Sequence, residues 1–170
     1  QTLGINARPV PQVRLALPEY WTLPILNHWV QLKGHIAFGK FTDENWQHDF
    51  TQRKSKYSEG VLYHSKAGYL RIGNDAAFCP LSIELGLEMA AQFGGKPYTY
   101  DGNGGLKCKA TEGGLKGMWH AFIPGGHDDG EGQYANIAGN QLGSWLMRIN
   151  YNADTWKLGI YADHFFEDDS

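Results

Sequence analysis

The segment from Leu81 to Phe93 alternates between apolar residues and polar or small residues without interruption. A period of two is typical of a β-strand with one apolar face, so the pattern predicts a strand. The apolar positions are Leu81, Ile83, Leu85, Leu87, Met89, Ala91 and Phe93. Because Glu84, Glu88 and Gln92 also recur every four residues, an amphipathic helix is the alternative for this segment taken alone.

Neighbouring segments favour the strand, because several of them alternate in the same way. These segments are residues 13–17, 30–38, 145–151 and 156–163. Residues 60–73 are also rich in β-forming side chains but alternate poorly, and a β-bulge near Gly68 would explain the break. We therefore predict about six strands. Most have one apolar face, and their other face carries long charged side chains.

The connections between these strands alternate in length. Long polar links at 43–59 and 94–140 alternate with short ones at 73–80 and 152–154. Outer-membrane barrels have short periplasmic turns and longer extracellular loops, so this alternation is typical of an up-and-down barrel. Thirteen residues extend over about 43 Å, which suits a tilted membrane strand.

Aromatic residues lie near the ends of the apolar faces, where interfacial girdles of membrane barrels are found. They are Trp29, Phe38, Phe93, Trp145, Tyr151 and Trp156. The alternative is that they form the core of a β-sandwich. We predict that residues 1–170 are one section of an all-β, antiparallel, up-and-down transmembrane β-barrel. In this prediction 43–59 and 94–140 are extracellular-side loops, Leu85 and its apolar neighbours face lipid, and Glu84, Glu88 and Gln92 face inward.

Composition supports an all-β chain and excludes some partners. The 22 glycines and 14% aromatic residues suit β-structure. A net charge of −3, without a basic run, gives no indication of nucleic-acid binding. No apolar segment approaches the roughly 18 residues of a spanning helix. The chain starts at Gln1 without a signal peptide, so we expect any such segment to be removed or to lie outside this sequence.

Five stretches of the chain also resemble a known family. They are "INARPVPQVRLALPEY", "KGHIAFGKFTDENWQHDF", "VLYHSKAGYLRIGN", "PLSIELGLEMAAQFGG" and "AGNQLGSWLMRINY…WKLGIYADHFFEDDS". In this order they resemble successive blocks of the capsule-assembly (Wzi-type) outer-membrane family, in its Bacteroidetes form. The resemblance covers almost the whole chain.

This resemblance implies a large antiparallel barrel in the bacterial outer membrane. The implied role is lectin-like attachment or assembly of capsular or other surface polysaccharide, without catalysis. Outer-membrane lipid and other outer-membrane subunits are the further partners it implies. Because the family's barrel needs several hundred residues, we expect these 170 residues to be an internal section of a longer protein.

The two glutamates of the first segment are the first candidates for chemistry. On a strand, Glu84 and Glu88 would lie about 13 Å apart, whereas the carboxyl pair of a glycosidase is about 5–9.5 Å apart. This separation disfavours a glycosidase pair, and the sequence contains no nucleophile elbow, phosphate-binding loop or CxxC motif. We therefore predict no enzyme and no cofactor. The bases expected beside them on the inner face are Arg8, Arg14, Lys33, His35, Lys66, Arg148 and Lys157. Such a network would either hold the lumen rigid or contact an anionic glycan. The candidate ligand contacts are Arg14, Lys33, His35, Glu84, Glu88 and Arg148.

Two tryptophans in the predicted loops are further candidates. Residues 114–124 predict a short amphipathic helix with Leu115, Met118, Trp119 and Phe122 on one side. This side would pack the loop onto the barrel mouth, or Trp119 would stack against a sugar. Trp46, in "NWQHDF", allows the same two interpretations.

The remaining ligand-type residues predict neither a metal site nor a disulfide. Carboxylates in a glycine-rich turn are suitable calcium ligands, but the spacing of His127, Asp128, Asp129 and Glu131 fits no established loop. Cys79 and Cys108 flank a strand about 40 Å long, whereas a disulfide needs Cα atoms within about 7 Å. Both thiols should be free or paired with chain outside this sequence.

Two other functional classes remain open from the sequence. One is a porin, or an accessory barrel subunit of a larger outer-membrane complex, which would show ion conductance or a stable partner. The other is a soluble carbohydrate-binding β-sandwich, which would express without detergent.

Overall fold

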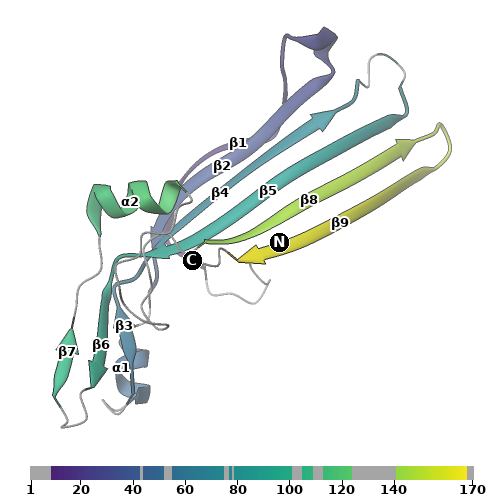
Figure 1. Ribbon diagram of the computed structural model, residues 1–170. Helices are drawn as coiled ribbons and strands as arrows, with labels where there is room; N and C mark the ends of the chain where they lie inside the picture. The colour runs from purple at the N-terminus through teal and green to yellow at the C-terminus, as the bar shows by residue number, and fades with distance from the viewer. Residues whose placement is uncertain are drawn as a thin grey trace.

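The computed structural model consists of two antiparallel sheets and two short α-helices (Figure 1). It describes residues 9–42, 44–51, 55–74, 77, 79–100, 105–108, 113–123 and 141–167. The six strands of the main sheet, in spatial order, are β1 (Gln12–Thr22), β2 (Val30–Lys40), β4 (Leu62–Ile72), β5 (Leu81–Phe93), β8 (Gln141–Asn152) and β9 (Lys157–Glu167). The small sheet contains β3 (Tyr57–Glu59), β6 (Lys96–Tyr100) and β7 (Leu106–Cys108). The helices are α1 (Trp46–Thr51) and α2 (Gly114–Phe122), and residues Leu26–His28 form a 3-10 turn.

The main sheet confirms the predicted antiparallel strands. Each of its strands pairs antiparallel with the next main-sheet strand along the chain. The segment 81–93 is a strand, so the helical alternative is excluded. Within the described residues the sheet is open, with β1 and β9 at its edges, and it does not close into a barrel.

The loop lengths segregate between the two ends of the main sheet. Residues 23–29, 73–80 and 153–156 form short connections at one end, which we call the short-turn end. The connections 41–61 and 94–140 lie at the opposite, long-loop end, and these carry the small sheet and both α-helices (Figure 1). The predicted alternation of long and short connections is therefore present.

The strand register gives the main sheet one mostly apolar face and an opposite face that carries most of the charged side chains, although Leu142, Tyr161 and Phe165 also lie on this second face. On the apolar face, Leu85 lies between Leu70 on β4 and Met147 on β8. On the opposite, polar face, Glu84 lies between Arg71 and Arg148. Exposed apolar side chains occur on every strand of the apolar face, including Val13, Leu15, Leu32, Ile36, Ile72, Leu81, Leu85, Met147, Leu158 and Ile160.

Two predictions about β4 are wrong: the β-bulge near Gly68 and the face on which Lys66 lies. Gly68 pairs in continuous register with both neighbouring strands, so the β-bulge expected there is wrong. The register shift lies instead in β1, between Leu17 and Trp21. Alternation fails in β4 because His64 and Lys66 lie on the apolar face, opposite Phe38 and Ile36 of β2. Lys66 was therefore wrongly expected on the inner face.

The helix α2 explains why these two polar residues tolerate the apolar face. Ala121 of α2 packs against Ala91 and Phe93 of β5, with Phe38, Leu62 and Met118 around them. The Lys66 ammonium donates a hydrogen bond to the carbonyl of Phe122, in the last turn of α2. His64 stacks on Phe38, with ring centroids 4.3 Å apart. The helix thus covers the long-loop end of the apolar face.

Phe93 is a fully buried phenylalanine in the interface between α2 and the sheet, so its loss tests that interface. Phe93→Ala should lower the free energy of unfolding by about 3–5 kcal/mol, because Phe93 is 1% exposed. Phe50→Ala is the matched control, because Phe50 on α1 is 80% exposed and should cost little. Urea unfolding followed by intrinsic fluorescence measures both values. Equal values for the two variants would contradict the described packing.

Candidate functional site

The small sheet begins where the paired strands β4 and β5 bend at glycines. The two strands continue as β3 and β6, which pair with each other through Tyr57–Tyr98 and Glu59–Lys96. Gly60, Gly94 and Gly95 have positive φ at this junction. A Cβ added to Gly95 would lie 3.0 Å from the carbonyl oxygen of Glu59. Glycine is therefore required at this bend, which positions the small sheet beyond the long-loop end.

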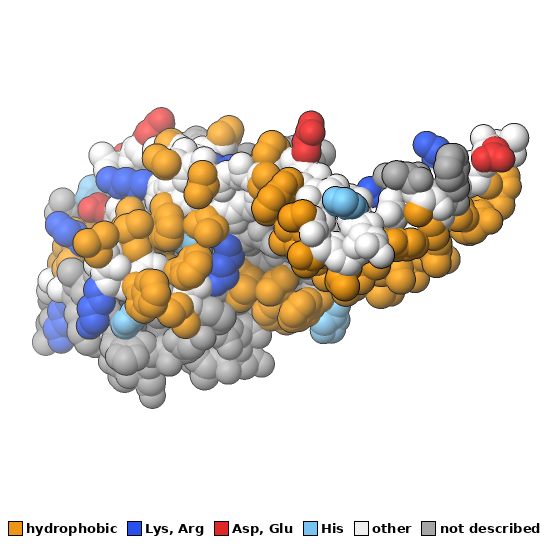
Figure 2. Space-filling model, turned by 90° about the horizontal axis from the view of Figure 1, so that it is seen from above, with side chains coloured by type: hydrophobic (Ala, Val, Ile, Leu, Met, Phe, Trp, Pro, Cys, Tyr) orange, Lys and Arg blue, Asp and Glu red, His pale blue; other side chains and the backbone are white. Residues whose placement is uncertain are grey.

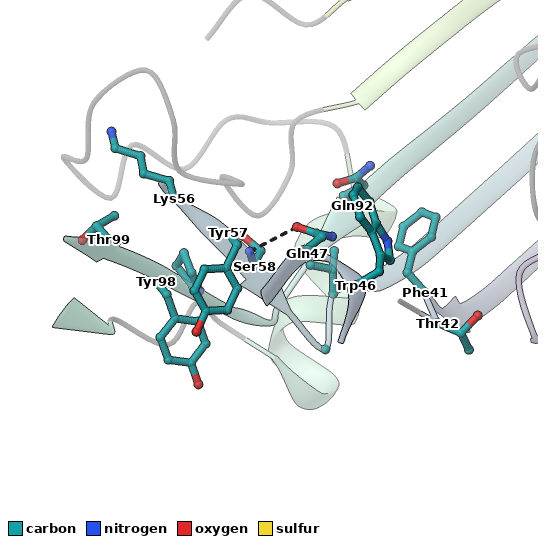
Figure 3. Close-up of a pocket in the computed structure, with 13 residues that line it drawn as sticks. Phe41, Thr42, Trp46, Gln47, Lys56, Tyr57, Ser58, Gln92, Tyr98 and Thr99 are labelled. Atoms are coloured by element: carbon teal, nitrogen blue, oxygen red, sulfur yellow. Dashed lines mark hydrogen bonds between the residues drawn. The ribbon is translucent and has the colours of Figure 1, made fainter. Parts of the chain in front are cut away.

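A pocket of about 470 Å³ lies between the small sheet, α1 and the end of the main sheet (Figure 3). We call it the loop pocket. It is lined by Phe41, Thr42, Trp46, Gln47, Lys56, Tyr57, Ser58, Gly60, Val61, Gln92, Pro97, Tyr98 and Thr99. Gln92 belongs to the polar face of β5, so the pocket lies next to that face at the long-loop end.

Aromatic rings give the loop pocket its shape. Tyr57 and Tyr98 are cross-strand neighbours whose rings stack at 4.8 Å with an interplanar angle of 11°. His48 of α1 meets the Tyr57 ring edge-on at 5.7 Å. The backbone N–H of Ser58 donates to Oε1 of Gln47 at 3.4 Å, which ties β3 to α1 (Figure 3). The Trp46 ring remains 55% exposed, so one flat ring is accessible to a ligand.

The polar groups of the loop pocket are mainly neutral hydroxyls and amides. Partial desolvation, followed by the negative charge of Glu59, raises the pKa of Tyr98 above its ordinary value. A tyrosine hydroxyl is protonated at neutral pH in any case, and part of this shift comes from a hydrogen bond between Tyr98 and Glu59. Rings combined with hydroxyl, amide and backbone groups suit a ligand that has apolar faces and many hydroxyls. A sugar has this chemistry.

A second group of candidate residues lies on the polar face of the main sheet, where tyrosines hydrogen-bond to the two glutamates. Tyr20 donates to Oε2 of Glu84 at 3.0 Å, and the side-chain amide of Asn150 donates to Oε1 at 2.9 Å. Tyr69 donates to Glu88. The Lys33 ammonium lies 4.5 Å from the Tyr20 ring centroid and 4.7 Å from that of Tyr69, a cation–π arrangement that joins the two pairs.

Several residues selected from the sequence surround one hollow on this face. Arg14, Lys33, His35 and Glu88 line a space of about 520 Å³ beside the register shift of β1, together with Tyr69. The hollow combines three basic side chains with one carboxylate. Nε2 of His35 also lies 3.3 Å from the Ser65 hydroxyl, within the sheet.

The other candidates lie elsewhere, so the structure does not form one site from all of them. Glu84 and Arg148 are cross-strand neighbours closer to the short-turn end. Trp46 lines the loop pocket, whereas Trp119 lies on α2 with 60% of its surface exposed. The sequence analysis missed Tyr57 and Tyr98. Their strands are too short for a periodic signal, and they meet only through long-range pairing.

The described residues can be compared with the predictions about a metal site, a disulfide and a membrane-spanning helix. His127, Asp128, Asp129 and Glu131 lie outside the described residues. Elsewhere in the described chain, His, Cys, Asp and Glu form no group of three or more that could hold a metal ion. Cys79 and Cys108 are free thiols. No described helix is long and apolar enough to cross a membrane.

Comparisons with models of protein families, with curated proteins and with solved structures found no match. The resemblance to the capsule-assembly family therefore stays a prediction.

The glycine bend provides a test of how the loop pocket is built. Gly95→Ala should loosen the pairing of β3 with β6, because alanine is strained at φ +92° and its Cβ would press on the Glu59 carbonyl. Gly68→Ala is the control, since no atom lies within 4 Å of the added Cβ. Hydrogen exchange should show faster exchange in β3 and β6 only in Gly95→Ala. Unchanged protection there would contradict the proposed role of the bend.

Proposed function

We propose that this chain is a section of a non-catalytic outer-membrane β-barrel that binds capsular or other surface polysaccharide at its long-loop end. One observation carries the proposal. Apolar side chains are exposed on every strand of the main sheet, whereas Glu84 and Glu88 on the opposite face accept hydrogen bonds from Tyr20 and Tyr69. A large exposed apolar surface marks contact with a membrane or with another protein. Strands with apolar-out and polar-in alternation are those of a membrane barrel.

The dimensions of the apolar face agree with a membrane. From Leu81 to Met89 the face extends over about 27 Å along β5. A tilt of 35–45° reduces this to about 21 Å along the membrane normal, close to the apolar band of about 25 Å in outer-membrane barrels. At the short-turn end the face finishes in Trp21, Tyr151 and Trp156, as an interfacial girdle would. The rings of Tyr151 and Trp156 stack at 5.2 Å.

A membrane location places a requirement on the two edges of the main sheet. The outer edges of β1 and β9 present backbone N–H and C=O groups that hydrocarbon cannot satisfy. In the proposed barrel, further strands pair with both edges. Such strands come from the same protein or from another subunit.

The polar face then fills the lumen and does not catalyse hydrolysis. Glu84 and Glu88 each accept a hydrogen bond from a different tyrosine, so each carboxylate has its own fixed partners. Lys33 lies over both tyrosine rings and joins the two pairs. This arrangement supports the structural role proposed for the two glutamates over an acid–base pair.

The loop pocket is the proposed contact with polysaccharide. It lies at the long-loop end, which faces outward in the proposed orientation. Its volume of about 470 Å³ and its accessible Trp46 ring suit part of a glycan chain. Stacked aromatic rings with neutral hydroxyls and amides bind many sugars without requiring a particular charge.

A porin or accessory barrel is the second candidate, and one observation favours it. The hollow lined by Arg14, Lys33, His35 and Glu88 holds two permanently cationic side chains against one carboxylate, and this excess would make the lumen locally basic, as in an anion-conducting pore. Ion conductance in planar bilayers would support that candidate. A soluble β-sandwich would need a second sheet over the apolar face, and among the described elements only α2 packs on that face.

The membrane contact predicts an unequal cost for arginine on the two faces of β5. Leu85→Arg should cost roughly 2–4 kcal/mol in folding free energy, because an arginine would replace an apolar side chain near mid-bilayer. Gln92→Arg is the control, since Gln92 is exposed and on the polar face. Reversible urea unfolding in phospholipid vesicles measures both. A negligible cost at Leu85 would contradict the membrane contact.

The polysaccharide contact predicts a specific loss at the loop pocket. Trp46→Ala should weaken binding about fivefold, since one stacking ring contributes on the order of 1 kcal/mol, and Trp46→Phe should retain part of the affinity. Trp156→Ala, at the short-turn end, should bind like the unaltered protein. Calorimetry with the capsular polysaccharide of the bacterium that makes the protein provides the measurement. Equal loss in both alanine variants, or release of reducing ends from the polysaccharide, would contradict the proposal.

A further inference from the structure

The helix α2 presents a second apolar surface in addition to the one that packs on the sheet. Gly117 and Ala121 are buried against the sheet, and Met118 and Phe122 are half-buried. Leu115 and Trp119, one turn apart, are 85% and 60% exposed. From the sequence, Leu115, Met118, Trp119 and Phe122 share one side that either packs the loop or offers Trp119 to a sugar. In the structure Met118 and Phe122 are half-buried, whereas Leu115 and Trp119 are exposed, so the packing interpretation is wrong for these two residues. Their exposure needs a separate explanation.

The position of α2 suggests what contacts this surface. The helix packs over Phe38, Leu62, Ala91 and Phe93, which lie on the apolar face just beyond Met89. It therefore borders the end of the exposed apolar band (Figure 1). In Figure 2, apolar side chains gather along the arm of the main sheet and again at the end where α2 lies. The exposed residues of α2 thus continue the apolar face at its boundary.

The composition of α2 is that of a helix at a lipid headgroup layer. Its ionisable residues, Lys116 and His120, are both basic, and Lys116 is exposed. Interfacial helices combine tryptophan and leucine on one side with basic residues on another. Basic residues near the membrane surface are attracted to anionic lipid phosphates. Tryptophan is enriched at the depth where hydrocarbon meets headgroups.

A helix of nine residues would not be stable at an interface by itself, but the sheet holds α2 in place. Lys66 donates to the Phe122 carbonyl, and the small residues Gly117 and Ala121 allow close packing on β4 and β5. Held in this way, the helix does not need to fold on binding lipid. The energetic cost of ordering a free amphipathic segment is therefore avoided.

We infer that α2 is an interfacial helix whose exposed Leu115 and Trp119 insert into the lipid headgroup layer at the long-loop boundary of the apolar face. The inference rests on the proposed outer-membrane location. A sugar site would surround the Trp119 ring with hydrogen-bonding groups, as the loop pocket does for its rings. The neighbour of Trp119 one turn away is an aliphatic leucine, which lipid accommodates better. The helix would hold the loop pocket at a fixed height above the membrane.

Nitroxide accessibility tests this inference in the full chain. In a Cys79→Ser, Cys108→Ser background, single labels are attached to Leu115→Cys, Trp119→Cys, Leu85→Cys and Phe50→Cys. The protein is reconstituted in vesicles of phosphatidylethanolamine and phosphatidylglycerol. Power saturation then compares collisions with oxygen, which partitions into lipid, and with a water-soluble nickel chelate. Labels at 115 and 119 should be intermediate between the lipid reference at 85 and the water reference at 50.

The possible outcomes distinguish this inference from the proposed function. If the label at 85 reports lipid while those at 115 and 119 match position 50, α2 is not interfacial but the membrane location stands. If the label at 85 is itself aqueous, the membrane location fails and the inference fails with it. If 115 and 119 are shielded from both reagents, another protein surface covers α2, which also overturns the inference.

Discussion

The two-residue period of the β-strand is the constraint on which the rest of this structure depends. Because alternate side chains point to opposite faces, a shift of one residue in any strand would exchange the faces. The register keeps Leu85 beside Leu70 and Met147, and Glu84 beside Arg71 and Arg148. Charges gathered in this way need nearby partners. Tyr20 and Tyr69 meet that need by donating to the two glutamates.

The exposed apolar face of the main sheet follows from this register, and it is the main basis of the proposed function. Its exposed apolar side chains are unfavourable in water, and α2 packs over its long-loop end. Where α2 lies, His64 and Lys66 can occupy apolar-face positions, because the helix supplies a carbonyl for Lys66 and aromatic contacts for His64. The change from apolar to polar side chains along β4 therefore marks the boundary between the exposed band and the covered region.

The long connections add the features that bear on ligand recognition. A glycine bend converts the β4–β5 pair into the β3–β6 pair, and this brings Tyr57 and Tyr98 together next to α1. The loop pocket is thus separate from the charged network on the polar face. In the proposed function, the main sheet keeps its hydrogen-bonded charges while the loops offer neutral and aromatic groups to the polysaccharide.

The sequence by itself determined the strands of the main sheet, their two faces and the segregation of loop lengths, because each depends on local spacing along one segment. It also predicted a helix within 114–124, which the structure shows as α2 at Gly114–Phe122. The tertiary structure decided which strand carries the register shift, which side of α2 is buried, and where Lys66 lies. It also brought Tyr57 to Tyr98 and Arg14 to Glu88. These depend on contacts between residues far apart in the chain, for which no local period exists.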